Sequence, residues 1–334
     1  MDATIVSRIL EAGGVITGKA VCEYYSTSAA SFTAATSPIA NPFCKGYSAG
    51  GSISGTANLV GKGEVDLGIG ADQGGSVCIP PGLCCLVGLK ATARLIQYPG
   101  FVSDEATIDY VGLMTKNILD NAILLEAIAI IYGLDDRHQA ETPFRDQVPN
   151  YSQILLDAKD AGVKGKERHH HSPIQRQRAK SKLLLSCCYC VQGVGSGRRR
   201  GRQTYTRDCS CYIWCSKQVG RASGGRQVMP TDLYEEMLQT TAQTIDKHHT
   251  LDYSAETESA ITMMSKTIGK LENTCPFNVS GHPALAILIG FVPAQSDEKV
   301  KVPASMQIVE RHFDEVPCSK VGFSCENARY WKEV

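Results

Sequence analysis

The sequence has no net charge, because its 334 residues include 34 Lys or Arg and 34 Asp or Glu. A protein with balanced charge exerts no general attraction on a polyanion or on an anionic membrane surface. The totals therefore predict neither a specific nucleic-acid partner nor a membrane partner.

Targeting signals and long apolar runs are missing as well. The first residues lack the basic start and the apolar block of a signal peptide. The longest apolar runs, near residues 122–131 and 284–292, are too short to span a bilayer. We therefore expect a cytoplasmic protein.

The composition favours a globular chain with many loops. It is 43% hydrophobic and contains 31 glycines, which is typical of an α/β protein. Fourteen cysteines would be many for a cytosolic enzyme, but six of them lie between Cys187 and Cys215. Without a secretory signal we interpret them as reduced thiols rather than as a disulfide framework.

Charge is distributed unevenly along the chain. Residues 164–226 contain 15 Lys or Arg and only two acidic residues, with little apolar periodicity. Like charges at this density repel one another and rarely pack into a core, so we predict that the segment is disordered. The chain then divides into an ordered block (1–163), this basic segment (164–226) and a second ordered block (227–334).

A zinc site is the alternative interpretation of the basic segment. Cys187-x-x-Cys190 followed by Cys211-x-x-x-Cys215 approximates a four-thiolate site, and nearby arginines could contact phosphates. The spacing is loose, and two further cysteines have no place in such a site. A strongly basic stretch also binds polyanions without a dedicated role, so we expect no metal and no specific nucleic acid.

Strands and helices alternate in the predicted secondary structure. Alternation of this kind favours a sheet covered by helices, which places the chain in the α/β class. Glycines are expected to end the first helix, and Asp2 is expected to cap its start. The predicted helices are 2–12, 56–61, 115–132, 231–249 and 257–273. The predicted strands are 14–22, which we expect to be buried, 65–71, 84–92, 283–291 and 304–310.

Two serines follow glycine pairs: Gly50-Gly51-Ser52 and, 24 positions later, Gly74-Gly75-Ser76. Glycine pairs let a ligand approach the main chain closely, so each hydroxyl can stand beside exposed N–H donors. Acyl transfer needs this combination of a nucleophile with donors for the developing oxyanion. Each turn alone is also compatible with a simple flexible turn. Neither turn carries the G-x-x-x-x-G-K-[ST] or G-x-G-x-x-G pattern of a phosphate loop.

Taken together, the two turns closely resemble the glycine- and serine-rich signature of the amidase signature family. The signature comprises "ANPFCKGYSAGGSISGTANLV" and "GEVDLGIGADQGGSVCIP". The segments "EATIDYVGLMTKNILDNAILLEAIA", "NTCPFNVSGHPALAILIGF" and "VPASMQIVERHFDE" also look like the family. The similarity covers about residues 1–163 and 270–334. Details such as "GADQGGS" are nearest to the bacterial-type amidases that act on simple carboxamides.

The resemblance implies the amidase signature fold and a Ser–cis-Ser–Lys triad that hydrolyses a carboxamide to a carboxylate and ammonia. By position Ser76 matches the nucleophile, and Ser52, after a cis peptide bond, matches the bridging serine. The oxyanion hole would use the main-chain N–H groups of Gln73, Gly74, Gly75 and Ser76. The substrate pocket would include Gly50, Gly51, Asp72 and Cys78. The family implies no cofactor, a small-molecule amide as substrate, and allows a homodimer.

The sequence also departs from the family pattern. The family's catalytic lysine lies some thirty residues before the segment that matches residues 2–10, and this sequence starts after that point. Lys19 matches a different, structural lysine. Cys78 stands where an arginine is expected. These departures imply weakened activity, because loss of one triad member commonly costs roughly 10⁴ to 10⁶ in rate. The alternative is an inactive amidase-like protein that binds a ligand or partner.

Overall fold

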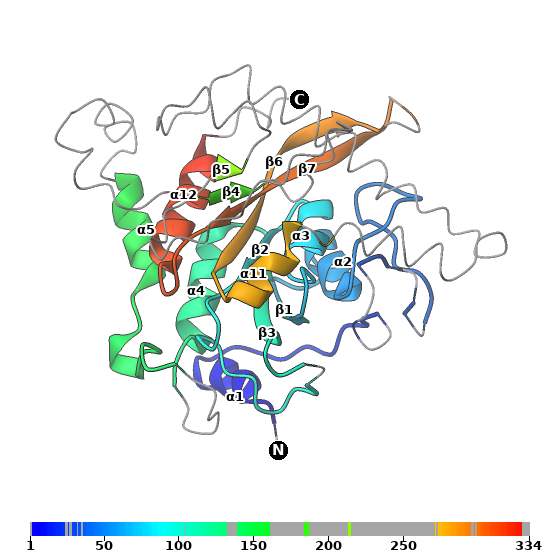
Figure 1. The fold of residues 1–334 in the computed structure, drawn as a ribbon. Helices are drawn as coiled ribbons and strands as arrows, with labels where there is room; N and C mark the ends of the chain where they lie inside the picture. Colours follow the sequence, from blue (N-terminus) through cyan, green and yellow to red (C-terminus); the bar gives the residue numbers. More distant parts are fainter. Residues whose placement is uncertain are drawn as a thin grey trace, which may run out of the picture.

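The structure is a computed structural model, and it describes most of both ends of the chain. The described residues are 2–160 except 24, 25, 27, 28, 32, 35, 104 and 132–138, together with 184–186, 213–214, and 271–328 except 272, 295, 296 and 298. Within these residues one mixed sheet and its covering helices form the architecture (Figure 1).

The sheet has seven strands in the order β1-β3-β2-β6-β7-β4-β5. Neighbouring strands are antiparallel, except that β4 and β5 are parallel. The strands are β1 (Leu67–Asp72), β2 (Val87–Lys90), β3 (Tyr110–Thr115), β4 (Leu184–Ser186), β5 (Ile213–Trp214), β6 (Ala284–Pro293) and β7 (Lys301–Val309). The central pair β2–β6 joins the two ends of the chain, since Leu89 lies opposite Leu285.

Helices cover both faces of the sheet (Figure 1). On one face Leu285 of β6 packs close to Gly322 of α12. On the other face Ser305 of β7 donates a hydrogen bond of 2.7 Å to the carbonyl of Gly82 in α3. The helices are α1 (Thr4–Glu11), α2 (Ser54–Lys62), α3 (Ile79–Leu83), α4 (Ile118–Ile128), α5 (Tyr151–Asp160), α11 (Cys275–Ser280) and α12 (Glu315–Asn327), with one 3₁₀ turn, η2 (Arg145–Gln147).

The core lies between the central strands and the helices packed on them. Every residue of β2 and β3 is buried, so neither strand shows the alternation of apolar and polar residues that is typical of a half-exposed strand. Aliphatic side chains such as Leu113, Leu125 and Ile308 are completely buried there. This rigid layer carries the loops that hold the two seryl turns.

Most predicted elements of the described chain are confirmed, including the α/β class. The helices predicted at 56–61 and 115–132 correspond to α2 and α4. The strands predicted at 65–71, 84–92, 283–291 and 304–310 correspond to β1, β2, β6 and β7. The predicted helix at 2–12 corresponds to α1, whereas β3, α3, α5, α11 and α12 were not predicted as separate elements.

The predicted buried strand at 14–22 is wrong. Residues 14–22 form no regular element, and Val15 is 81% exposed. A strand needs a neighbour for its backbone N–H and C=O groups, and no described strand pairs with this segment. The expected cap at Asp2 is also wrong, because Ala3 occupies the N-cap position of α1 without a side-chain hydrogen bond.

Several predictions lie largely outside the described residues. They include the helix at 231–249, most of the helix at 257–273 and all four cysteines of the alternative zinc site. From the basic segment the structure describes only β4 and β5, so its predicted disorder stays a prediction. Among the helices in the described part of the chain, none combines the length and apolarity needed to cross a bilayer.

Candidate active site

The two seryl turns meet, as the resemblance to the amidase signature family implied. The hydroxyl oxygens of Ser52 and Ser76 are hydrogen-bonded at 2.9 Å. Ser52 lies just before α2, Ser76 lies between β1 and α3, and the Gly51–Ser52 peptide bond is cis. Ser52 is completely buried, whereas Ser76 retains 8% exposure. Ser76 is therefore the more exposed residue of the pair.

The first turn is held by main-chain hydrogen bonds and by contact with α3. The N–H of Gly51 donates to the carbonyl of Ala29 at 2.8 Å, and the N–H of Gly50 donates to Ser48 Oγ at 2.9 Å. Gly50 has a φ of +76°, and a Cβ there would lie 2.9 Å from Leu83 Cδ1 in α3. Only glycine satisfies both the backbone angle and this close approach.

The second turn is organised by Asp72, the last residue of β1. Its Oδ1 accepts the N–H of Gly75 at 2.6 Å, and its Oδ2 accepts the N–H of Val77 at 2.7 Å. Asp72 is completely buried, and Asn278 Nδ2 also donates to its Oδ1, at 2.7 Å. We predicted a pocket-wall position for this residue, and in the structure its carboxylate faces the inner side of the turn.

The hydrogen bond to Asp72 corrects one predicted oxyanion donor. The N–H of Gly75 is already used, so it cannot point at a substrate while this turn keeps its shape. Within the described part of the chain, the main-chain N–H groups of Gln73, Gly74 and Ser76 donate no hydrogen bond. These three groups are therefore the main-chain donors left beside the Ser76 hydroxyl.

Helix α11 packs against the second turn from a position about 200 residues later in the chain. Thr274, its N-cap residue, donates a hydrogen bond from Oγ1 to the carbonyl of Gly74. The thiol of Cys275 lies 2.9 Å from the place where a Cβ on Gly74 would be. Sequence reasoning did not single out these residues, because only the tertiary structure brings them to the turn.

Lys90 is a buried lysine near this site, and the sequence alone suggested no role for it. Its Nζ donates to the carbonyl of His282 at 2.6 Å and lies 4.2 Å from the centre of the Tyr110 ring. Burial lowers the pKa of Lys90 to about 8, although Asp72 and Cys78 oppose that shift. Among the described lysines none hydrogen-bonds to Ser52, and Lys19 is exposed.

Cys78 occupies the position where the resemblance implies an arginine. It is 2% exposed, and burial, followed by the charge of Asp72, raises the pKa of its thiol well above the usual range. The side chain is thus neutral. It contributes no positive charge beside Asp72, whose carboxylate accepts hydrogen bonds from neutral donors and interacts with the charge of Lys90.

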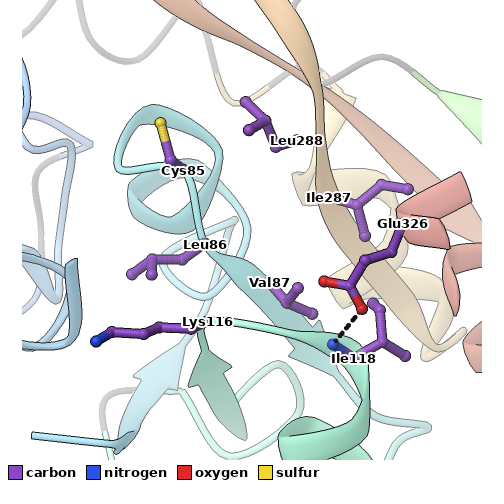
Figure 2. A pocket seen from close by; sticks show the side chains of 8 residues that line it. All are labelled: Cys85, Leu86, Val87, Lys116, Ile118, Ile287, Leu288 and Glu326. Atoms are coloured by element: carbon purple, nitrogen blue, oxygen red, sulfur yellow. Dashed lines mark hydrogen bonds between the residues drawn. The ribbon is translucent and has the colours of Figure 1, made fainter. Parts of the chain in front are cut away.

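A separate small cavity of about 40 Å³ lies away from the two serines, and Figure 2 shows its lining. Glu326 accepts the N–H of Ile118 at 3.1 Å there, while the side chain of Lys116 points away from it. The lining residues are Cys85, Leu86, Val87, Lys116, Ile118, Ile287, Leu288 and Glu326. None belongs to the seryl turns, so this cavity is not the site of the serine pair.

Known proteins resemble this chain in sequence. An enantioselective amidase of Rhodococcus rhodochrous is 44% identical over 201 residues, which cover 58% of this chain and 38% of the relative. A subunit of the glutamyl-tRNA(Gln) amidotransferase of Exiguobacterium sibiricum is 25% identical over 387 aligned positions, covering 98% of this chain and 77% of the relative. The chain thus matches well under half the length of the Rhodococcus enzyme.

Solved structures resemble the fold. The 6-aminohexanoate cyclic dimer hydrolase superposes with a TM-score of 0.62 at 19% identity, covering 100% of this chain and 79% of that one. The corresponding glutamyl-tRNA(Gln) amidotransferase subunit of Thermotoga maritima superposes with a TM-score of 0.59 at 20% identity, covering 99% and 77%. The family model described as Amidase matches residues 1–169, which is just over half of the sequence. With that match, the serine pair and the shared fold, the chain belongs to the amidase family.

Proposed function

We propose that this chain hydrolyses a carboxamide through an acyl-enzyme on Ser76. The observation that carries the proposal is the 2.9 Å hydrogen bond between Ser76 and Ser52. A serine becomes a nucleophile when a neighbouring group takes its proton, and Ser52 is placed to take it. Ser52 is the better relay and Ser76 the better nucleophile, because only Ser76 has exposed surface.

The proposed reaction has two steps. Ser76 Oγ attacks the amide carbon and loses its proton to Ser52, while the carbonyl oxygen gains negative charge. The N–H groups of Gln73, Gly74 and Ser76 are the proposed donors to that oxygen. The carbon–nitrogen bond then breaks, and the amine leaves with a proton. Water attacks the acyl ester in the second step, which releases the carboxylate and restores the Ser76 hydroxyl.

Ser52 needs a base to accept its own proton, and no described residue that could act as one is hydrogen-bonded to the Ser52 hydroxyl apart from Ser76. Lys90 is bound to main-chain carbonyls, and Lys19 is exposed. We therefore place the terminal base outside the described residues. The pair of serines passes the proton toward that base.

The proposed substrate is a small carboxamide. The Rhodococcus relative is named an enantioselective amidase, and the structural neighbour at a TM-score of 0.62 is named a hydrolase of a cyclic aminohexanoate dimer. The first name refers to amide hydrolysis, and the second to hydrolysis of a cyclic dimer of 6-aminohexanoate. The substrate class is taken from these relatives, because the cavity in Figure 2 does not belong to the serine pair.

Ser76→Ala tests the proposal. We expect the variant to lose amide hydrolysis and labelling by a fluorophosphonate probe, because the attacking oxygen is gone. Ser52→Ala should keep the attacking oxygen but lower the labelling rate by at least roughly 10³-fold. Ser324→Ala is the control and should label like the parent, because the Ser324 hydroxyl donates within α12, to the carbonyl of Lys320, away from both turns. Equal labelling of the parent and Ser76→Ala would exclude the site, and a parent that never labels would favour a protein that binds without hydrolysing.

A further inference from the structure

We propose that Thr274 and Asn278 are positioning residues that hold the Gln73–Ser76 turn in the shape that presents its N–H donors. The proposal rests on the function proposed above and deepens it. It assigns a role in the site to α11, which starts about 200 residues after Ser76.

The first support is the peptide unit between Gly74 and Gly75, which is held from both sides. Thr274 Oγ1 donates to the carbonyl oxygen of Gly74. Asp72 Oδ1 accepts the N–H of Gly75 at 2.6 Å. Because this carbonyl and N–H belong to one rigid plane, the two hydrogen bonds fix the rotation of that plane. The neighbouring N–H groups of Gly74 and Ser76 are oriented as a consequence.

The second support is the set of hydrogen bonds that the Asp72 carboxylate accepts. The buried carboxylate accepts hydrogen bonds from the N–H groups of Gly75 and Val77 and from Asn278 Nδ2. A buried carboxylate is stable only when such donors replace water. Asn278 is itself 1% exposed, and Tyr110 Oη donates to its carbonyl at 2.5 Å. Asn278 thus fixes the position of the Asp72 carboxylate, and this carboxylate in turn holds the second seryl turn.

The third support is steric. A Cβ on Gly75 would collide with the hydroxyl and Cβ of Thr274, and a Cβ on Gly74 would lie 2.9 Å from Cys275 Sγ. The start of α11 is therefore in direct contact with both glycines. Any shift of Thr274 changes the space in which the turn sits, so the helix and the donor loop move as one unit.

The experiment replaces the Thr274 hydroxyl in the full chain and measures both the turn and the chemistry. Thr274→Val keeps the shape and removes the donor, Thr274→Ser restores the donor, and Asn278→Asp replaces a donor to Asp72 by a second acceptor. Thr115→Val is the matched control, because Thr115 is also buried and donates to a main-chain carbonyl, that of Asn117, at 2.7 Å. The control also loses the hydrogen bond that Asn121 Nδ2 donates to Thr115 Oγ1. Thr115 lies at the opposite end of β3 from Tyr110.

The first readout is hydrogen exchange of the main chain at residues 72–79, which needs no turnover. We expect roughly 10-fold faster exchange in Thr274→Val and Asn278→Asp, parental exchange in Thr274→Ser, and no local change in Thr115→Val. The second readout is kinetic: kcat should fall about 10- to 100-fold with KM nearly unchanged, because oriented donors act on the transition state.

The two readouts separate the possible failures. If exchange at residues 72–79 is the same in Thr274→Val and Thr115→Val, the positioning role is overturned, whatever the activity. If exchange at residues 72–79 becomes faster in Thr274→Val but the parent shows no Ser76-dependent turnover or labelling, the proposed function is wrong and the positioning role is supported. A variant in which KM rises and kcat is unchanged also contradicts the proposal.

Discussion

At the scale of single residues, the site depends on which acceptor each main-chain N–H group of the second turn binds. The sequence places four N–H groups around Gly74-Gly75-Ser76, yet the structure uses that of Gly75 to bind Asp72. A buried carboxylate attracts the nearest donors strongly, because hydrogen bonds to a charged group are about twice as strong as neutral ones. Asp72 therefore shapes the turn and binds one of the N–H groups that the resemblance assigns to the oxyanion hole.

Asp72→Asn tests this view. Asparagine offers one oxygen, and its NH₂ group would face an N–H donor of the turn, so a buried donor loses its acceptor. We expect a loss of about 1–3 kcal/mol in the free energy of unfolding and a fall of roughly 10²-fold in acylation of Ser76. Urea denaturation and probe labelling measure the two effects. Asp120→Asn, at the start of α4, should change labelling little, and an equal effect of both substitutions would contradict this role.

At the scale of elements, the two seryl turns meet because α2 and α3 pack closely behind them. Gly50 has a φ of +76°, and a Cβ there would lie 2.9 Å from Leu83 Cδ1 and 3.1 Å from Pro80 Cα in α3. The absence of a side chain lets the loop before α2 lie directly on α3. The 23 residues between the serines supply α2 and β1, which return the chain to the same place.

Gly50→Ala measures this contact, and Gly46→Ala is its control. Both glycines have positive φ, +76° and +86°, but a Cβ on Gly46 would meet nothing within 4 Å. Gly46→Ala should therefore cost only the left-handed backbone penalty, about 1–2 kcal/mol. Gly50→Ala adds overpacking against α3, which costs about 1–3 kcal/mol more. Chemical denaturation gives both values, and equal losses would argue against the close packing.

At the scale of the whole molecule, one charged group is buried where the two ends of the chain join. Lys90 lies at the end of β2, next to β6, and donates to the carbonyl of His282. Burial lowers its pKa from 10.5 to about 8, and it is 1% exposed. Nearby carboxylates of Asp72 and Glu315 oppose the shift but do not cancel it.

This pKa predicts a pH dependence of stability. Between about pH 8 and pH 10.5 the unfolded chain binds a proton at Lys90 that the folded chain does not, so stability from this group rises with pH. We expect the free energy of unfolding, relative to that of Lys90→Met, to rise by about 2 kcal/mol between about pH 7.5 and pH 9.5. The comparison removes the contribution of the cysteines, which titrate in both proteins. A constant or falling difference would show that Lys90 keeps an ordinary pKa.

The sequence predictions are accurate where local interactions determine the structure and fail where contacts between distant residues determine it. Segments with strong local patterns, such as α2, α4 and β6, were predicted because their residues alone favour those elements. The predicted strand at 14–22 is wrong, because a strand also needs a neighbouring strand for its hydrogen bonds, and the sequence pattern shows only the apolar side chains. Likewise, the sequence shows that Gly75 has an N–H but cannot show which acceptor takes it.

The amino-acid sequence by itself determined the two glycine–serine turns, their spacing and the resemblance to the family, since these are local features of composition and order. Only the tertiary structure decided that the two hydroxyls lie 2.9 Å apart, that Asp72 takes the N–H of Gly75, and that Thr274 and Asn278 hold the turn. Those contacts join residues that lie from a few to about 200 positions apart, and the packing of helices on a shared sheet brings the distant ones together.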